Sequence, residues 1–406
     1  MLDEEYGSLP LRPRGLYSGD HLYYDRWTRS IKRLPGHLDA LTGYLLPWGT
    51  LDEHAKHLAR SMGTETSSLS EALEELVRAG VLISKTEFFN SLRNSSSTGR
   101  TRITSLVCCT KNRPGSLKKF LSSYMRGVSE SGCEPPRFLI FDDSDENETH
   151  ETNVRVIQEV QGSFPSPRVF LLGKNEKADF ILKIPKAIKE LPEGLIEFAL
   201  SGDYGANRNA SLLLTAGECI LSADDDTEYL FGSPPGQEDR GKWEICSSFE
   251  PGLLGLFSER QDMPEALSLK PMDILAEHEN YLGKTAGELS TAFGSPETLV
   301  LRNCDPKLTE LLLRGTKRVV LTSTGLAGDS GLSAPRVALV QRNEAREILF
   351  SGKGYRVNRF ARNVHTVAQH PILTRAPHFI AVQYGLDNRR LVWRMQGIVC
   401  GNSVCT

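Results

Sequence analysis

Three consecutive carboxylates, Asp224, Asp225 and Asp226, follow a short apolar run at residues 219–223 that has the composition of a strand. Three acids in succession repel one another if they are left unpaired. A divalent cation relieves that repulsion, and carboxylate oxygens are hard ligands that suit Mg²⁺ or Mn²⁺. The three aspartates therefore predict a Mg²⁺ or Mn²⁺ site, with a solvated loop that caps a helix as the alternative interpretation.

Two earlier strand-like runs also end in polar residues. The β-rich run 103–109 precedes the sequence TKNR at residues 110–113, and the run 137–141 precedes DDS at residues 142–144. Helical patterns separate these runs from each other and from a third run at 168–173, so we expect an α/β unit with a parallel sheet. Ligands of such sheets bind beyond the carboxyl ends of the strands. The polar residues are therefore candidate ligand contacts, although DDS alone is also ordinary turn chemistry.

The order of these motifs resembles a known family. The segments "LVCCTKNRPGSL", "LIFDDSDEN" and "GANRNASLLLTAGECILSADDDT" occur in the order found in family-2-type glycosyltransferases of the GT-A fold. The resemblance covers residues 103 to about 230. It implies a fold of the α/β class, the GT-A mixed sheet flanked by helices, and an activity that uses a nucleotide-sugar donor. The sequence departs from the usual pattern at the cysteine pair in the first strand and at Thr227, where a third acid is common.

The resemblance also implies roles for single residues. Asp224 and Asp226 form the D-x-D pair that holds a Mn²⁺ or Mg²⁺ ion bridging the donor diphosphate. Cys109 and Lys111 lie beside the nucleotide base, Asp143 accepts from the base or ribose, and Arg208 approaches the base or diphosphate. The full implied set of donor-binding residues is Cys109, Lys111, Arg113, Asp142, Asp143, Arg208 and Asp225.

The chemistry of sugar transfer asks for these groups independently of the resemblance. A nucleoside diphosphate leaves readily only when a cation meets its growing charge, and the sugar passes through an oxocarbenium-like state. An inverting reaction also needs a general base for the acceptor. Asp329 lies where inverting relatives carry an acidic base in a loop, so it is the candidate catalytic residue; a glycine-flanked turn aspartate is the alternative.

Three weaker candidates lie in the second half of the chain. His365 and His370 could supply a further metal ligand, and the segment 387–390 (DNRR) could contact the acceptor or the diphosphate. We expect His278 and Glu279 to lie on a solvated helix face. The loop-forming segment 231–241 is either a flap over the donor or a surface loop.

The first 93 residues predict a small separate module. Helical periodicity at 38–46, 51–62 and 71–80 is followed by an extended run at 81–84, which is the outline of a winged helix. Thr50 and Ser70 are the expected caps of the second and third helices.

Two functional interpretations of this module differ in the charge that they need. The third helix carries Glu71, Glu74 and Glu75, which a DNA backbone repels. Peptide recognition by strand addition needs no basic face. The segment 38–84 resembles the PqqD-like domains that hold leader peptides in ribosomal peptide maturation. A structural or oligomerisation module is the remaining alternative.

Composition bounds the setting of the protein. The 406 residues carry 48 Lys+Arg against 51 Asp+Glu, and this balance disfavours a non-specific nucleic-acid binder. No apolar run reaches transmembrane length, and the acidic start is unlike a signal peptide. The eight cysteines form no C-x-x-C pair, so we expect a cytoplasmic protein with reduced thiols. The expected organisation is a PqqD-like module at 1–93, a linker at 94–102 and a GT-A domain at 103–406, which either closes with a strand at its carboxyl terminus or is truncated there.

These observations together predict a metal-dependent glycosyltransferase of the hexosyltransferase type. It moves a sugar from a nucleotide-sugar to an acceptor, and a ribosomal peptide held by the amino-terminal module is a candidate acceptor. Two alternatives remain. A nucleotidyltransferase normally has a glycine-rich loop after its first strand, where this chain has TKNRP. A non-catalytic peptide- or DNA-binding protein with a decayed transferase domain is the other. The sugar, the nucleotide and the stereochemical course stay open.

Overall fold

The computed structural model has a mixed α/β fold in which helices flank a six-stranded sheet. It describes residues 4–11, 13–17, 20–25, 28–93, 101–132, 134–164, 166–187, 194–200, 204–233, 241–247, 253–257, 268–270, 273–301, 303–315, 317–329, 363–367, 371–375 and 383–389. The predicted linker at 94–102 falls largely outside these ranges. Among the described residues no helix is both long and apolar enough to cross a bilayer.

The six-stranded sheet has the order β16-β20-β10-β7-β8-β9. Its four strands from β10 to β9 are parallel, whereas β20 runs antiparallel to β10 and β16 antiparallel to β20. The parallel arrangement predicted for the first three strands is confirmed. The strands are β7 Ser105–Thr110, β8 Arg137–Asp142, β9 Val169–Leu172, β10 Cys219–Asp224, β16 Leu321–Ser323 and β20 Gln383–Asp387.

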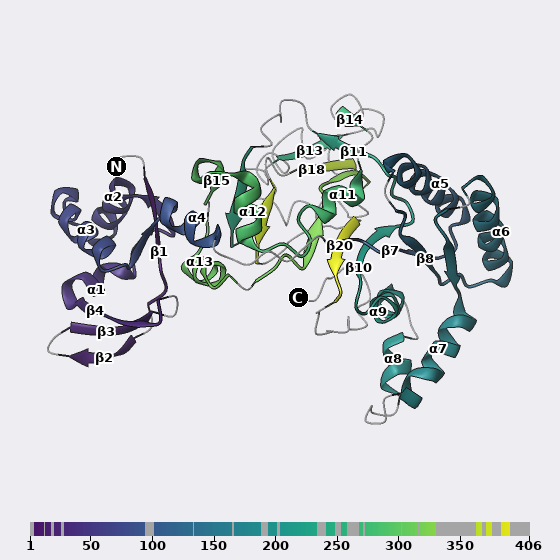
Figure 1. The fold of residues 1–406 in the computed structure, drawn as a ribbon, viewed down its shortest axis with the longest axis horizontal. Helices are drawn as coiled ribbons and strands as arrows, with labels where there is room; N and C mark the ends of the chain where they lie inside the picture. The colour runs from purple at the N-terminus through teal and green to yellow at the C-terminus, as the bar shows by residue number, and fades with distance from the viewer. Residues whose placement is uncertain are drawn as a thin grey trace, which may run out of the picture.

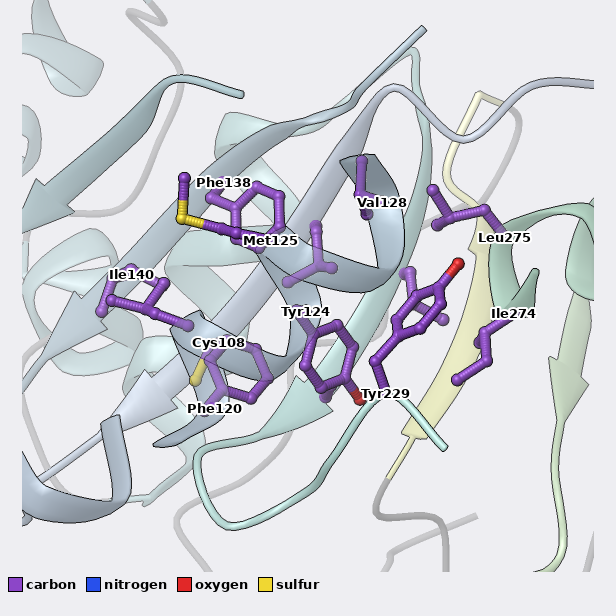
Figure 2. Packing of buried hydrophobic residues seen from close by; sticks show 14 of the residues in the cluster. Cys108, Phe120, Tyr124, Met125, Val128, Phe138, Ile140, Tyr229, Ile274 and Leu275 are labelled. Atoms are coloured by element: carbon purple, nitrogen blue, oxygen red, sulfur yellow. The ribbon is translucent and has the colours of Figure 1, made fainter. Parts of the chain in front are cut away.

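Alternate residues of the central strands face two separate hydrophobic cores, because successive side chains of a strand point to opposite faces. From β7, Leu106 and Cys108 join the core under α5 (Pro114–Ser131) and α6 (Asn147–Ser163), as Figure 2 shows for part of that cluster. Val107 joins the opposite core. There α7 (Lys174–Ala187), α8 (Leu195–Leu200) and α9 (Tyr204–Leu214) cover the sheet (Figure 1).

The amino-terminal module has the three predicted helices. They are α1 Gly36–Thr42, α2 Leu51–Met62 and α3 Ser70–Arg78, and strand β6 (Leu82–Ser84) follows them. Thr50 caps α2 as predicted, through a capping box with Glu53. The cap predicted at Ser70 is wrong: Leu69 occupies the N-cap position and makes no side-chain hydrogen bond there.

The strands of this module do not form the expected local wing. The first strand of the chain, β1 (Glu5–Ser8), lies between β5 (Trp48–Thr50) and β6 and is antiparallel to both. His54, buried in α2, joins the parts, because its Nε2 lies 3.0 Å from the Tyr6 carbonyl oxygen and its Nδ1 accepts from Leu46 N. A second sheet, unpredicted, contains β2 Pro13–Tyr17, β3 Asp20–Asp25 and β4 Ser30–Pro35.

The remaining described elements lie in the second half of the chain. They are three small sheets, three helices and a short 3₁₀ turn at Pro296–Thr298; a further 3₁₀ turn, Thr66–Ser68, lies between α2 and α3 of the amino-terminal module. The sheets contain β11 Phe231–Ser233 with β14 Ser268–Lys270; β12 Trp243–Cys246 with β15 Leu299–Val300 and β19 Ile372–Thr374; and β13 Leu253–Phe257 with β18 Asn363–Val367 and β17 Leu326–Asp329. The helices are α11 Ile274–Glu279, α12 Ala286–Phe293 and α13 Pro306–Leu313.

Helix α4 (Lys85–Arg93) joins the amino-terminal module to the rest of the molecule. It lies beside α12 and α13 (Figure 1), and its Phe88 and Phe89 are fully buried. One hydrophobic cluster includes these phenylalanines together with Trp243 and Leu289. Residues from both sides of the segment 94–102 therefore share a core.

We expect Phe88→Ala to destabilise the whole chain, because it removes a buried aromatic ring from this shared core and leaves a cavity. Such truncations cost about 3–5 kcal/mol. Urea unfolding measures the loss. Asn90→Ala, at an exposed position of the same helix, is the matched control and should change stability by less than about 0.5 kcal/mol. Equal stability of the two variants would show that α4 does not hold the module in place.

Candidate functional site

The carboxyl ends of three parallel strands meet at one edge of the sheet. Asp224 of β10 is in register with Cys109 of β7, and Thr110 of β7 is in register with Asp142 of β8. The chain leaves β7 for β8 and β9 and then returns to pair β10 on the other side of β7. Such a reversal of strand order opens a crevice at the carboxyl ends, where ligands of open α/β sheets bind. The predicted motifs therefore lie where the topology favours a ligand.

Each of the three successive aspartates has a partner within the chain. Asp224 accepts from Arg208 at 2.8 Å, and Asp226 accepts from Arg113 Nη1 at 2.9 Å. Asp225 accepts from the Thr110 hydroxyl at 2.6 Å and forms an ion pair with Arg113 Nη2 at 3.2 Å. Two arginines therefore already offset the repulsion among the three carboxylates, and the Mg²⁺ or Mn²⁺ site stays a prediction.

Burial separates the inner aspartate from the outer two. The Asp225 side chain is only 1% exposed, whereas those of Asp224 and Asp226 are 35% and 54% exposed. Burial raises the pKa of Asp224 and Asp225, and Arg208 and Thr110 respectively oppose that rise. Asp225 thus holds the loop in place, and the outer pair is open to solvent at the carboxyl edge of the sheet.

The outer pair has the chemistry of a divalent cation site. Among the described residues, Asp224 Oδ2 and Asp226 Oδ1 make no hydrogen bond or ion pair. Across the same residues no group of three or more histidine, cysteine, aspartate or glutamate side chains could hold a metal ion. Mg²⁺ commonly takes one or two carboxylates and completes its shell with phosphate oxygens and water. The residues present therefore fit a cation that arrives with a phosphate ligand.

Arg208 is fixed by a residue that the sequence did not suggest. Its Nη1 donates to the Tyr384 hydroxyl at 3.0 Å, and its guanidinium lies 5.8 Å from the centre of the Tyr384 ring. Tyr384 belongs to β20, which is far from α9 in the chain but pairs with β10. No local sequence pattern predicts this contact, because only the antiparallel pairing of β20 with β10 brings Tyr384 to the site.

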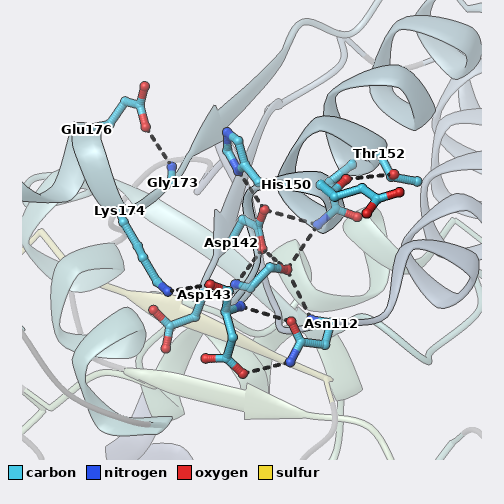
Figure 3. Close-up of polar contacts among 12 residues, drawn as sticks. Asn112, Asp142, Asp143, His150, Thr152, Gly173, Lys174 and Glu176 are labelled. Carbon is cyan, nitrogen blue, oxygen red and sulfur yellow. Dashed lines mark hydrogen bonds and ion pairs between the residues drawn. The ribbon is translucent and has the colours of Figure 1, made fainter.

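Asp142 organises the turn after β8. Its buried carboxylate accepts from the backbone and hydroxyl of Ser144 and from Asn153, and His150 Nδ1 lies 2.8 Å away (Figure 3). Burial opposes ionisation, but the hydrogen bonds from Ser144 and Asn153 hold the pKa of Asp142 below its usual value. Direct donor contact by Asp142 stays a prediction, and the structure gives this residue a positioning role.

The turns after β7 and β8 are tied to each other. Asn112 and Asp145 exchange two hydrogen bonds, of 2.8 and 3.0 Å, and Lys111 forms an ion pair with Asp145 at 3.1 Å. Asn112 takes up a left-handed conformation with φ of 57°, which asparagine tolerates better than most residues. Lys111 therefore lies at the crevice edge with its charge directed to the neighbouring turn.

Asp143 meets a buried lysine that the sequence analysis missed. Lys177 of α7 is 8% exposed, and its Nζ donates to Asp143 at 2.7 Å and to the Asn207 side chain at 2.8 Å. The contact joins the β8 turn to α9. A lysine in a polar helix carries no sequence signal of such a role.

Cys109 lies at the end of β7, directly beside Asp224 of the neighbouring strand β10. Burial raises the pKa of its thiol to about 11, so it is protonated at neutral pH. The described cysteines, Cys108, Cys109, Cys219, Cys246 and Cys304, are free thiols.

A buried polar chain supports the aspartates from behind. The Thr227 hydroxyl donates to the Asp224 carbonyl at 2.7 Å and lies 3.0 Å from the Tyr124 hydroxyl, which accepts from Gln383 at 2.6 Å. A threonine at position 227 therefore ties the aspartate turn to α5 and β20.

Gly127 of α5 touches the Tyr229 ring so closely that a Cβ there would lie 2.0 Å from a ring carbon.

Other candidates from the second half of the chain fare differently. The expectation that Asp329 lies in a loop is wrong, because it ends β17, in a sheet separate from the central one. Its catalytic role stays a prediction. His365 lies in β18, and His370 is outside the described residues.

The structure contradicts part of one expectation and the whole of another. Asp387 pairs with Cys219, at the opposite end of β10 from Asp224 and roughly 17 Å away along the strand, so it cannot contact a diphosphate at the aspartates. Arg389 holds it instead. Contact of the segment 387–390 with an acceptor stays a prediction, and Arg390 lies outside the described residues. His278 is buried rather than solvated, and its Nδ1 lies 2.8 Å from the Thr322 hydroxyl. Glu279 accepts from the Ile103 backbone.

Comparison with protein-family models and with curated protein sequences finds no match for this chain. The family resemblance therefore depends on the motifs and on the geometry described above.

We expect Tyr124→Phe to destabilise the protein by about 1–3 kcal/mol, because the buried Gln383 amide loses its acceptor and Thr227 loses a partner. Urea unfolding provides the measurement. Tyr44→Phe, at a half-exposed position, is the control and should leave stability unchanged. A neutral Tyr124→Phe would mean that the polar chain does not support the aspartate turn.

Acid should destabilise the protein through His278. Burial lowers its pKa to about 4, below the ordinary 6.5, so the unfolded chain binds a proton that the folded chain does not between those values. The contribution to stability is complete above pH 6.5 and is lost as the pH falls towards 4. Between pH 7 and pH 5 we expect a loss of about 2 kcal/mol, which His278→Gln abolishes in urea unfolding. His37→Gln, at an exposed site, should keep the full loss; equal pH profiles for both variants would contradict this assignment.

Proposed function

We propose that this protein is a metal-dependent glycosyltransferase of the GT-A, family-2 type. The observation that carries the proposal is the gathering of the three motif ends at the point where strand order reverses. There the outer carboxylates Asp224 and Asp226 face the crevice between Arg208 and Arg113.

The site divides into two parts that suit the two ends of a nucleoside diphosphate. Asp143, Lys177 and Asn207 form a hydrogen-bonded polar cluster at the β8 side, with Lys177 and Asn207 buried, and we assign the base and ribose to this side. The outer carboxylates and the two arginines suit the diphosphate. When bound, a divalent cation there neutralises the charge that develops on the leaving diphosphate.

The chain's own residues have defined tasks in this proposal. Arg208, held by Tyr384, keeps the Asp224 carboxylate oriented toward the crevice. Thr110 and Thr227 fix the aspartate turn from below. Preorganised charges of this kind lower the barrier to charge development because they need no rearrangement during reaction. The acceptor base stays unassigned apart from the candidate Asp329.

The amino-terminal module supports a peptide as the acceptor. Its three helices followed by β6 resemble the outline of a PqqD-like winged helix, although β1, from before the helices, lies between β5 and β6 in place of a local wing. Strands β5 and β6 form the two edges of that sheet, and an extended peptide can add to such an edge through backbone hydrogen bonds. The acids Glu71 and Glu74 are exposed on α3, which disfavours DNA.

Donor binding tests the proposal directly. We expect the purified protein to bind one of a panel of UDP-, GDP- and dTDP-sugars in the presence of Mn²⁺ and to lose that binding in EDTA. Asp226→Asn should weaken the Mn²⁺-dependent binding by at least about tenfold, because it removes a charged metal ligand. Calorimetry measures binding, and slow hydrolysis identifies the donor.

Glu130→Gln, an exposed change on α5, is the matched control and should bind as the wild type does. A wild-type protein that binds no donor with Mn²⁺ or Mg²⁺ would contradict the proposed function.

A further inference from the structure

The two arginines at the aspartates are held in different ways. Arg208 contacts Asp224, the Tyr384 hydroxyl and Ser222, and its side chain is 27% exposed. Arg113, directly before α5, is 52% exposed and makes its ion pairs only with Asp225 and Asp226 among the described residues. Arg208 is therefore held in one position by several contacts, whereas the more exposed Arg113 can change its position.

The two contacts of Arg113 also differ from each other. The inner partner, Asp225, is buried and pinned by Thr110, so its carboxylate cannot follow a moving arginine. The outer partner, Asp226, is more than half exposed. Exposed ion pairs of this kind contribute little stability. The outer contact is the one that can be exchanged without disturbing the turn.

A divalent cation on Asp226 conflicts with that outer contact. Arg113 Nη1 lies 2.9 Å from Asp226 Oδ2, and a metal ion sits about 2.1 Å from a carboxylate oxygen. A dication and a guanidinium that share one carboxylate repel each other strongly at such separations. The guanidinium must therefore weaken metal binding or move away from it.

We propose that Arg113 is the counter-ion of Asp226 in the metal-free chain and that it yields this carboxylate to the divalent cation and turns to the donor diphosphate. The inference rests on the proposed function and adds a coupling to it. The cation alone binds weakly because it competes with Arg113. A diphosphate removes the competition, since it offers the displaced guanidinium a new anionic partner with matching geometry. Metal and nucleotide therefore strengthen each other's binding.

The experiment compares binding of two probes to wild type and to Arg113→Gln. The probes are Mn²⁺ alone, followed by electron paramagnetic resonance of the free ion, and UDP, GDP and dTDP in saturating Mn²⁺, followed by calorimetry. We expect Arg113→Gln to bind Mn²⁺ alone about two- to fivefold more tightly, as the loss of a competing exposed ion pair allows. The same variant should bind the nucleoside diphosphate about tenfold more weakly, because a charge-assisted contact is gone.

Opposite changes for the two probes distinguish exchange from a structural role, which weakens both. Lys118→Gln is the matched control, since it removes a cation that pairs with Glu159 on the surface of α5; neither probe should change. Arg113→Lys keeps the charge without the fork and should resemble wild type for Mn²⁺ alone. It also keeps the test valid if Arg113→Gln unfolds, which thermal unfolding reports.

The outcomes separate the two proposals. A wild type that binds both probes, with Mn²⁺ binding to Arg113→Gln unchanged or weaker, overturns the exchange and leaves the proposed function standing. If Arg113→Gln unfolds, Arg113→Lys is compared with wild type instead. An Arg113→Lys variant that binds the nucleoside diphosphate as wild type does and binds Mn²⁺ more weakly also overturns the exchange and leaves the proposed function standing. A wild type that binds neither Mn²⁺ nor any of the three nucleotides overturns both.

Discussion

The parallel pairing of β10 with β7 is the constraint on which the candidate site depends. The chain runs outward from β7 through β8 and β9 and must then cross back, through α9, to reach the free side of β7. Parallel strands deliver their carboxyl ends to one edge, so this return sets Asp224 beside Cys109 and leaves Thr110 beside Asp142. A one-residue slip in that register would turn the aspartates to the other face.

The acidic side chains concentrated at this edge have to be paired by basic side chains from the surrounding elements. Each acid is met by a cation or a donor from a different element: Arg113 before α5, Arg208 in α9 and Lys177 in α7. Removal of Lys177 from its largely buried pair with Asp143 would leave an uncompensated charge, which is far more costly than the pair is stabilising. The site is therefore complete only when α7 and β20 are in place, although neither carries a motif.

The sequence predicts those parts of the site that depend on local patterns, and it does not predict the parts that depend on contacts between distant segments. The strands, the helices between them and the shared edge follow from periodicity and from motif position, and the aspartates follow from their local pattern. The roles of Tyr384 and Lys177 were not predicted, because only long-range packing brings these residues to the edge of the sheet. His278 was misjudged since its neighbours are polar in sequence, while the antiparallel strands β16 and β20 cover it in the fold. Repulsion among the acids does not by itself establish a metal, because Arg113 and Arg208, which lie elsewhere in the sequence, also offset it.

Under the proposed function, the packing of α4 decides how an acceptor peptide would reach the donor. Phe88 and Phe89 join the amino-terminal module to a core that also holds Trp243 and Leu289, so the module does not swing freely on the segment 94–102. A peptide added to the edge of β5 or β6 then starts from a fixed origin. The span between its bound segment and the donor edge has to be bridged by the peptide itself. For a flexible tether the effective concentration is highest when its length matches the span. The spacing of the acceptor residue from the recognition segment, rather than movement of the module, would therefore select which side chain is modified.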